Sequence, residues 1–295
     1  MNLVILTSLA MLAFAGNSLL CRLALLQTGI DAATFTSVRL VSGALVLWLI
    51  ASRRAPHTTR LAGSWLSALA LFAYAEAFSF AYLSLSAGTG ALLLFAAVQL
   101  SMIGWGLSRG EQFTRAQLAG FILAVGGLVF LLLPGLSAPP LGGALMMAAA
   151  GVAWAVYSLK AKGAGDPTKA TAGNFVRAAP LAVAVSVATL SSMHWSIAGI
   201  GYGLASGILT SGLGYVIWYA ALRDLKVTSA ATVQLSVPVI AAFGGVVFLG
   251  EAASLRLMIA SVLVLGGVAI VLLARGHPQR ENTLKAPADS PPPSR

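Results

Sequence analysis

The chain has 295 residues, of which 58% are hydrophobic and 9% are charged, and its mean hydropathy is +0.90. A soluble domain carries about 25% charged residues, so this composition excludes a water-soluble globular protein and indicates an integral membrane protein. The apolar residues form runs of about 20, which indicates membrane-spanning helices and excludes barrel strands, whose pattern alternates over about 10 residues.

Ten apolar runs follow one another along the chain, and each predicts one membrane-spanning helix. They are expected at about 3–26, 32–51, 62–83, 88–107, 115–133, 141–159, 170–190, 197–222, 229–249 and 255–274. The connections are short, so neighbouring helices are expected to run antiparallel. The stretch 275–295 has almost no apolar residues, and we expect it to be a disordered cytoplasmic tail.

The basic residues predict how the chain crosses the membrane. Fourteen of the 18 lysines and arginines fall in alternate loops or in the tail, and the loops between them (27–31, 84–88, 134–140 and 191–196) contain none. By the positive-inside rule the basic side is cytoplasmic, so both termini are expected inside a bacterial-type plasma (inner) membrane. This topology explains the net charge of +10 without a nucleic-acid partner.

One stretch of the chain occurs twice, at an offset of 140 residues. Gly110-Glu111 is followed by Gly126-Gly127, and Gly250-Glu251 is followed by Gly266-Gly267. Repeated segments at a fixed offset indicate repeated structural units. Five predicted helices separate the two copies, so Glu111 and Glu251 are expected at opposite membrane surfaces, each in a turn at a helix N-terminus, where a carboxylate is favourable.

The fold class we expect is all-α integral membrane, with ten transmembrane helices arranged as two inverted five-helix repeats, 1–134 and 141–274. Ala13-Phe14-Ala15 and Ala153-Trp154-Ala155 are also 140 residues apart. Inverted repeats are typical of secondary transporters, which bind substrate between the halves. Residues 13–15 also resemble a signal-peptide cleavage site, but no basic residues precede them, and removal would unbalance the repeat.

These phased motifs resemble those of the EamA-type transporters of the drug/metabolite transporter superfamily. Each half contains a Gly-Glu turn before a Gly-Gly helix, and Arg39 and Arg177 occupy the second helix of each half. Within the superfamily the chain looks most like the YddG-type aromatic amino-acid exporters. The resemblance covers 1–274 and implies alternating access around a central cavity. Val98 stands where the second half has Pro238, which argues against a fully symmetric motion.

Motifs for catalysis, cofactors and metals are absent from the sequence. No phosphate-binding loop is present, so nothing indicates that ATP drives the process. His57, His194 and His277 fall in predicted loops or the tail, and Cys21 is the only cysteine. We therefore expect no enzymatic activity, no cofactor and no bound metal, and the sequence indicates no protein partner.

Aromatic and amide side chains within the apolar runs are the candidates for the substrate site. In the run 62–83, Tyr74, Phe78 and Tyr82 recur every four residues and form one stripe, and in the run 141–159 an aromatic cluster shares one helix face. Core packing is the alternative interpretation of both patterns. The predicted substrate-binding residues are Trp154, Tyr157, Ser158, Phe78, Tyr82, Gln99 and Asn17.

Glu76, Arg39 and Arg177 are the candidates for coupling or ion pairing. A charge at the bilayer centre costs about 2.5–3.5 kcal/mol on insertion scales, so Glu76 needs a cavity, a partner or a proton. It lies about 200° around the helix from Tyr74, so either the aromatic stripe or Glu76 faces the cavity, but not both. Arg39 and Arg177 are expected to snorkel to lipid headgroups, although a guanidinium facing the cavity would suit a substrate carboxylate.

The function we expect is secondary transport of small organic metabolites, with amino acids, including aromatic ones, as the first choice and the lipid bilayer as the environment. Export is what the resemblance implies. A drug or other metabolite/proton antiporter is one alternative, but it would want a glutamate where Phe14 stands. A nucleotide-sugar or phosphate-ester exchanger would need more cations than Arg39 and Arg177. A non-transporting scaffold is the remaining alternative.

Overall fold

The computed structural model describes residues 2–54, 62–110, 112–135, 138–161, 166–222, 224–225 and 227–274. Within these ranges the chain forms helices and their connections, and no strand. The prediction of a disordered tail at 275–295 and the prediction for Glu111 lie outside the described residues.

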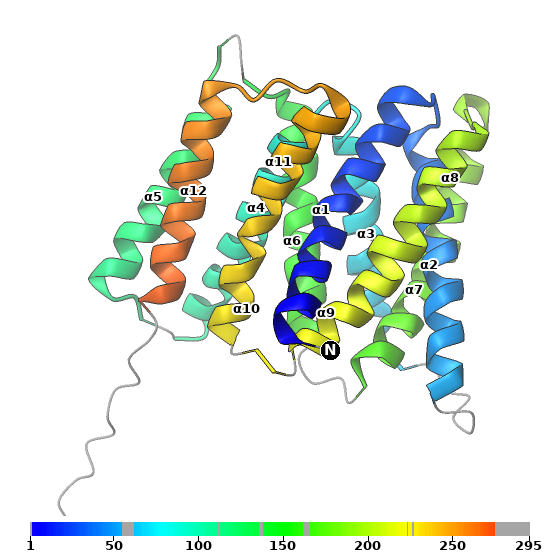
Figure 1. Cartoon of the computed structure of the whole chain (residues 1–295), viewed down its shortest axis with the longest axis horizontal. Coiled ribbons are helices and arrows are strands. Elements are labelled where there is room, and N and C mark those ends of the chain that lie inside the picture. The colour runs from blue at the N-terminus through cyan, green and yellow to red at the C-terminus, as the bar shows by residue number, and fades with distance from the viewer. Residues whose placement is uncertain are drawn as a thin grey trace, which may run out of the picture.

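This part of the chain forms ten helical rods, where a rod is either a single helix or a series of helical segments that follow one another directly (Figure 1). Eight are single helices: α1 (Leu3–Gln27), α2 (Ala32–Arg54), α3 (Trp65–Ala81), α4 (Ala87–Ser108), α5 (Arg115–Leu132), α6 (Leu141–Ala161), α7 (Pro167–Ala188) and α12 (Leu255–Leu273). The eighth rod runs through α8 (Ile197–Ala205), the π-helical segment η2 (Ser206–Leu213) and α9 (Gly214–Leu222), after a short turn η1 (Leu190–Ser192). The ninth rod consists of α10 (Val227–Gln234) and α11 (Ser236–Leu249).

The length and apolarity of these rods confirm the all-α membrane fold. Nine helical stretches in the described residues are long and apolar enough to cross a membrane, and α3, with 17 residues, is a shorter apolar helix. Helix starts are specified locally, because serine or threonine hydroxyls accept a hydrogen bond from the backbone N–H three residues on. These N-caps are Ser64, Ser86, Thr114, Ser196 and Ser254.

Pro238 explains why the ninth rod is interrupted. A proline lacks the backbone N–H, and its ring meets the carbonyl of the residue four positions earlier, here Gln234. α10 ends at Gln234, and α11 begins at Ser236. Val98 occupies the corresponding position in α4, and α4 is unbroken from Ala87 to Ser108. The two halves therefore differ in backbone continuity at this point.

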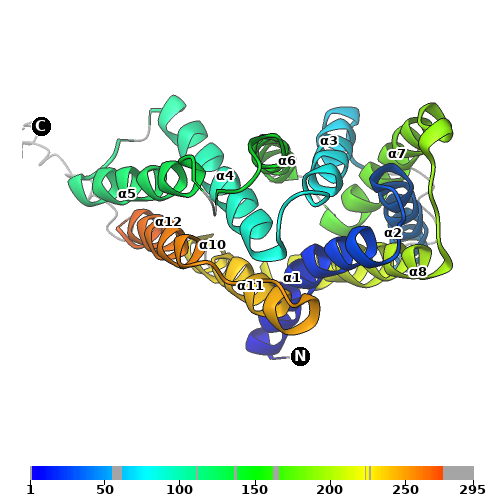
Figure 2. The ribbon, with the colours of Figure 1, turned by 90° about the horizontal axis from the view of Figure 1, so that it is seen from above.

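The helices of the two predicted halves are interleaved. α2 packs on α7, α3 on α6 and α5 on α12, and α1 packs on both the eighth rod and α11. Seen from above, the α5–α12 pair lies at one edge and α2, α7 and α8 lie at the other, with α1, α3 and α6 between them (Figure 2). The middle of the molecule is therefore built from helices that are distant in sequence.

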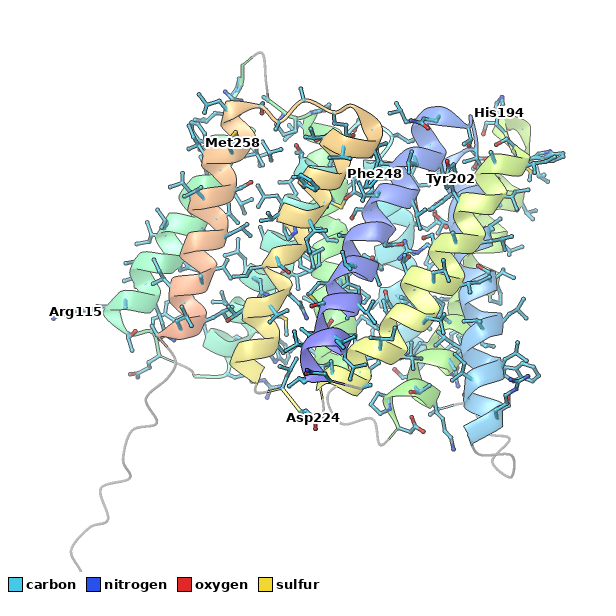
Figure 3. The ribbon with its side chains drawn as sticks, viewed as in Figure 1. Arg115, His194, Tyr202, Asp224, Phe248 and Met258 are labelled. Carbon is cyan, nitrogen blue, oxygen red and sulfur yellow. The ribbon has the colours of Figure 1, made fainter. Side chains whose placement is uncertain are left out.

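The two ends of the bundle take their names from residues that lie at them. The Asn2 end carries the start of α1, and it also carries Arg115 and Asp224 (Figure 3). The Asp31 end carries the α1–α2 connection, and His194 and Met258 lie there (Figure 3).

α5 and α12 pack against each other at the repeated glycine pairs. A Cβ added to Gly267 would lie 2.5 Å from the carbonyl oxygen of Gly120, and a Cβ added to Gly127 would lie 2.8 Å from Cβ of Leu263. A Cβ on the first glycine of either pair would meet nothing within 4 Å. The second glycine of each pair therefore allows the close backbone approach that small residues provide between membrane helices.

Asp31 joins the α1–α2 connection to the connection before α8 through hydrogen bonds. Its Oδ1 accepts a hydrogen bond from the Thr34 N–H at 2.9 Å, and its Oδ2 accepts one from the His194 N–H at 3.0 Å. The Asp31 N–H donates to the carbonyl oxygen of His194 at 2.9 Å. Burial raises the pKa of the Asp31 carboxyl, but the hydrogen bonds from Thr34 and His194 outweigh burial, and the pKa is lowered.

This lowered pKa makes Asp31 a source of pH-dependent stability. Its contribution is expected in full above the ordinary aspartate pKa and is lost as pH falls through the lowered folded-state value. Asp31→Asn is expected to lower the unfolding temperature at pH 7 by a few degrees and to weaken the acid sensitivity of that temperature. Thermal unfolding of detergent-purified protein measures both effects, and identical curves for the variant and the wild type would contradict the prediction.

Candidate functional site

A small cavity lies among α1, α3, α4, α6 and the eighth rod. The volume open to the centre of a water molecule is about 20 Å³, and on this measure about 10–15 Å³ holds one water. The walls must therefore move apart before an organic molecule can enter. The wall residues are Phe14, Asn17, Ser18, Tyr74, Phe78, Leu94, Phe95, Trp154, Thr210 and Tyr215.

The aromatic rings of the wall contact one another across helices. The ring centroid of Trp154 on α6 lies 4.8 Å from that of Tyr74 on α3 and 5.3 Å from that of Tyr215 on α9. Tyr74 lies 5.5 Å from Phe78, and Phe14 on α1 lies 6.1 Å from Tyr215. With Phe95 on α4, the aromatic rings of the wall come from five rods, three in the first predicted half and two in the second.

Asn17 organises the polar part of the wall. Its Oδ1 accepts hydrogen bonds from Ser206 Oγ at 2.7 Å and Thr210 Oγ1 at 3.2 Å, and its Nδ2 donates to the Tyr74 hydroxyl at 3.4 Å. Both hydroxyls that donate to Asn17 come from η2. π-Helical turns are rare and frequently occur at functional sites, and in this protein η2 supplies polar groups of the cavity.

Glycines allow η2 to approach α2 closely. A Cβ added to Gly207 would lie 2.4 Å from the carbonyl oxygen of Arg39, and a Cβ added to Gly212 would lie 2.4 Å from Cγ1 of Val46. A larger residue at Gly207 would clash with the backbone of α2, and a larger residue at Gly212 would displace the Val46 side chain. The glycines therefore bring the hydroxyls of η2 within hydrogen-bond distance of α1 and α2.

Arg39 lies directly behind the aromatic wall. Its side chain is buried, with the residue 1% exposed, and its Nε donates to Ser211 Oγ at 3.1 Å while its Nη2 donates to the Tyr74 hydroxyl at 3.2 Å. Its guanidinium carbon lies 5.4 Å from the ring centroid of Tyr74 and 5.1 Å from that of Phe78. The expectation that Arg39 snorkels to lipid headgroups is therefore wrong, because α2 directs this side chain towards α3 and η2.

The seven predicted substrate-binding residues divide into two groups. Trp154, Phe78 and Asn17 form part of the wall. The remaining four do not line it. Tyr157 contacts Trp154 from behind, with centroids 5.4 Å apart, and Tyr82 contacts Phe78 from behind at 4.8 Å. Gln99 is buried on α4 and Ser158 is half-buried on α6.

Glu76 and Arg177 lie away from the cavity wall. The carboxylate oxygens of Glu76 are buried and have no hydrogen-bond partner among the described residues, and Glu76 shares a face of α3 with the exposed Trp65 and Leu69. Arg177 Nη1 donates to the carbonyl oxygen of Ala62 at 2.9 Å, before α3 begins. Of the two arrangements that the helix geometry allows for α3, the structure has the aromatic stripe towards the cavity and Glu76 away from it.

Several wall residues were not among the predicted site residues, namely Thr210 and Tyr215 on the eighth rod, Leu94 and Phe95 on α4, and Phe14 and Ser18 on α1. The repeat contained a signal for the eighth rod. The position 140 residues after Phe78 is Trp218, which lies 5.7 Å from Phe14 between ring centroids. Trp218 lies on α9, the helix that also contributes Tyr215, but Tyr215 itself corresponds to Ala75, so the offset did not indicate that residue.

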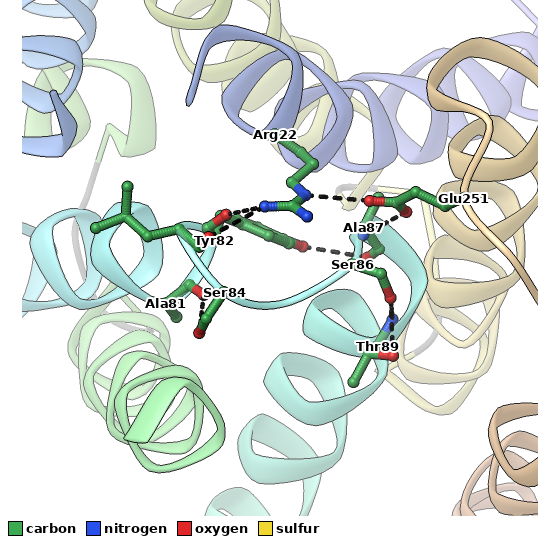
Figure 4. Close-up of polar contacts among 9 residues, drawn as sticks. Arg22, Ala81, Tyr82, Ser84, Ser86, Ala87, Thr89 and Glu251 are labelled. Atoms are coloured by element: carbon green, nitrogen blue, oxygen red, sulfur yellow. Dashed lines mark hydrogen bonds and ion pairs between the residues drawn. The ribbon is translucent and has the colours of Figure 1, made fainter. Parts of the chain in front are cut away.

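An ion pair joins four parts of the chain towards the Asp31 end (Figure 4). Arg22 Nε lies 3.1 Å from Glu251 Oε1, and the two side chains are only 14% and 12% exposed. Arg22 Nη1 also donates to the Tyr82 carbonyl oxygen at 2.7 Å, and Glu251 Oε2 accepts from the Ala87 N–H at 2.8 Å. Glu251 does lie at a helix N-terminus, as predicted, but the helix is α4 and not α12, which follows Glu251 in the sequence.

Comparisons with known proteins identify relatives of this chain. Residues 141–273 match the EamA-like transporter family. The chain is 53% identical over 279 residues to an uncharacterized protein of Pseudomonas aeruginosa, covering 94% of this chain and 97% of that protein. It is 32% identical over 165 residues to the threonine/homoserine exporter RhtA of Salmonella typhimurium, covering 54% of this chain and 55% of the exporter. It is 26% identical over 275 residues to an uncharacterized transporter of Archaeoglobus fulgidus, covering 90% of this chain and 95% of that protein.

A solved crystal structure has the same fold. The superposition has a TM-score of 0.67 and covers 93% of this chain and 99% of the other, at 22% sequence identity. The family match over 141–273 is consistent with the alignment to the Archaeoglobus fulgidus transporter along most of the chain. The match of residues 141–273 to the EamA-like transporter family, together with the transporter relatives, supports a small-molecule transporter of the membrane.

Proposed function

We propose that the protein exports amino acids by alternating access around the cavity between its two halves. The observation that carries this proposal is the chemistry of the cavity wall. Aromatic rings such as Trp154 and Tyr215 adjoin the neutral polar groups of Asn17 and Thr210. Mostly apolar sites with a few placed polar groups bind small organic molecules. The rings suit an apolar or aromatic side chain, and the amide and hydroxyl oxygens suit an ammonium group.

The relatives support this substrate class and direction. RhtA is named a threonine/homoserine exporter, and the match to this chain covers slightly more than half of each protein. The six aromatic residues of the wall favour larger side chains than threonine, and this supports the narrower similarity to YddG-type exporters of aromatic amino acids.

An inverted repeat of 1–134 and 141–274 is part of the proposal. The packing supports it, because α1 packs on the eighth rod as α6 packs on α3, while α2 pairs with α7 and α5 with α12. Gly110 and Gly250, the glycines of the two Gly-Glu turns, both have positive φ, at 90° and 66°. Glycine adopts this left-handed conformation without steric cost, so both turns require the same residue type.

By the positive-inside rule we assign the Asp31 end to the outer side of the membrane and the Asn2 end to the cytoplasm. The Arg22–Glu251 pair then closes the outer side, one helical turn of α1 beyond Ser18 in the cavity wall. In an export cycle, substrate reaches the cavity from the Asn2 end, and the ion pair separates to release it outwards. Glu76 is the candidate for coupling to protons in this cycle.

Flux measurements in liposomes containing the purified protein test the proposal. The panel contains phenylalanine, threonine, a cationic drug and a sugar phosphate, each with and without a pH gradient. We expect saturable amino-acid flux. Transport of only the drug or only the sugar phosphate would favour one of the other transporter classes, and flux that does not respond to the pH gradient would remove Glu76 as a coupling group.

Trp154→Ala is expected to raise the KM for phenylalanine about 10- to 100-fold, because the lost ring contacts are worth about 1.4–2.8 kcal/mol. Trp48→Ala is the matched control, since Trp48 is 48% exposed on α2 and does not line the cavity. Equal KM values for the two variants would contradict the assignment of the cavity as the substrate site.

A further inference from the structure

Arg39 is a buried cation, and the described part of the chain places no anion beside it. The residue is 1% exposed, and no carboxylate among the described residues lies within ion-pair distance of it. The groups that accept its hydrogen bonds, Ser211 Oγ and the Tyr74 hydroxyl, are neutral. A guanidinium keeps its charge inside proteins, so this part of the molecule carries an uncompensated positive charge within the membrane.

One nitrogen of Arg39 lacks a partner. Nη1 is buried and makes no hydrogen bond to any of the described residues. Leaving a charged donor unsatisfied in an apolar environment is costly, and such groups in native proteins call for an explanation. A single carboxylate would supply both an acceptor for Nη1 and the missing negative charge. A carboxylate binds the two Nη atoms of a guanidinium through two parallel hydrogen bonds.

Tyr74 connects this cation to the cavity. Its ring is part of the cavity wall, and its hydroxyl accepts hydrogen bonds from both Arg39 Nη2 and Asn17 Nδ2. The guanidinium also lies against the ring of Phe78, a second wall residue. A displacement of Tyr74 as the walls separate would therefore expose the guanidinium to the cavity, with Asn17 beside it.

We propose that Arg39 binds the carboxylate of the transported substrate, so that the protein selects organic carboxylates. The carboxylate replaces the Tyr74 hydroxyl as acceptor of Nη2 and engages Nη1. The side chain of the substrate then lies against Trp154 and Phe14. This inference deepens the proposed function and depends on substrates entering this cavity, but it makes a separate statement about the chemical group that is recognised.

The test compares substrates that differ only at the carboxylate. Phenylalanine, phenylalanine amide and phenethylamine are assayed for flux in liposomes and for protection of the detergent-purified protein against thermal unfolding. For the wild type we expect phenylalanine to be preferred at least tenfold over both other compounds. Arg39→Gln is expected to abolish this preference, and Arg39→Lys to retain part of it, because lysine keeps the charge but not the planar pair of donors.

Arg177→Gln is the matched control. Arg177 is the predicted counterpart of Arg39 in the other half, but it donates to the Ala62 carbonyl near the Asn2 end, away from the cavity wall. We expect the Arg177 variant to keep the acid-to-amide ratio of the wild type. A folded Arg39→Gln protein with an unchanged ratio would overturn the inference.

Two results with the wild-type protein distinguish a failure of this inference from a failure of the proposed function. If the wild-type protein exports or binds phenylalanine and its amide equally well, the Arg39 inference fails while the amino-acid exporter stands. If it transports no amino acid but does transport an organic acid without an amino group, such as phenylpropionate, the proposed function fails, and the Arg39 inference is supported when Arg39→Gln abolishes that flux.

Discussion

Gly267→Val is expected to destabilise the protein severely, by forcing two packed helices apart. A Cβ at Gly267 would lie 2.5 Å from the Gly120 carbonyl oxygen and 2.6 Å from the Ala124 nitrogen, and both are backbone atoms of α5. Because no side chain can rotate away, α5 and α12 must separate. Overpacking typically costs about 1–3 kcal/mol, and we expect the upper end of this range or more. Thermal unfolding in detergent, followed by size exclusion, measures the loss.

The neighbouring glycine provides the matched control for this substitution. Gly266→Val makes the same chemical change one residue earlier in α12, where an added Cβ meets nothing within 4 Å. We expect its unfolding temperature to be close to that of the wild type. The same contrast should hold in α5 between Gly127→Val and Gly126→Val. Equal destabilisation within either pair would show that helix propensity, rather than helix contact, decides the outcome.

Glu251→Gln is expected to open the Asp31 end of the molecule. The substitution removes the charge that pairs with Arg22 and weakens the acceptor for the Ala87 N–H, in a place where both side chains are almost buried. Breaking a buried pair costs about 3–5 kcal/mol, and a pair at a membrane surface is expected to reach the lower part of this range. Such a change moves the population of a two-state transporter by about 100-fold.

Cys21 provides the measurement for this prediction. It is fully buried on α1 next to Arg22, and it is the only cysteine in the chain. In the wild type we expect slow modification by a membrane-impermeant maleimide, and in Glu251→Gln we expect modification at least tenfold faster. Asp224→Asn is the control, because it neutralises an exposed carboxylate at the opposite, Asn2 end of the bundle. Equal labelling rates for the two variants and the wild type would contradict a closing role for the ion pair.

The number and approximate ends of the helices could be predicted because these properties are local. An apolar run of about 20 residues can satisfy its backbone in a membrane only as a helix, whatever lies beside it. The caps at Ser64 and Thr114 act within three residues, so they too are specified by short segments. Even the interruption before Pro238 follows from covalent structure, since proline cannot complete the hydrogen bond to Gln234.

The site could be predicted only in part. Trp154, Phe78 and Asn17 were recognisable because they are aromatic or amide side chains in otherwise apolar helices, and they line the cavity. Tyr215 and Thr210 were missed because the eighth rod is rich in aromatic and small polar residues on every side. The sequence does not show which of these face inward.

Two features were decided by the tertiary structure alone. The burial of Arg39 depends on which side of α2 meets α3 and η2. The small polar residues of α2, such as Thr36, Ser37 and Ser42, lie around the helix and single out no one side. The partner of Glu251 is Arg22, which lies 229 residues away and meets it only when α1 packs beside α11. The sequence by itself determined the membrane class, the helices and the repeated motifs, because these depend on neighbouring residues. The assembled bundle decided which charges are paired and which polar groups meet at the cavity, because those contacts join segments from distant parts of the chain.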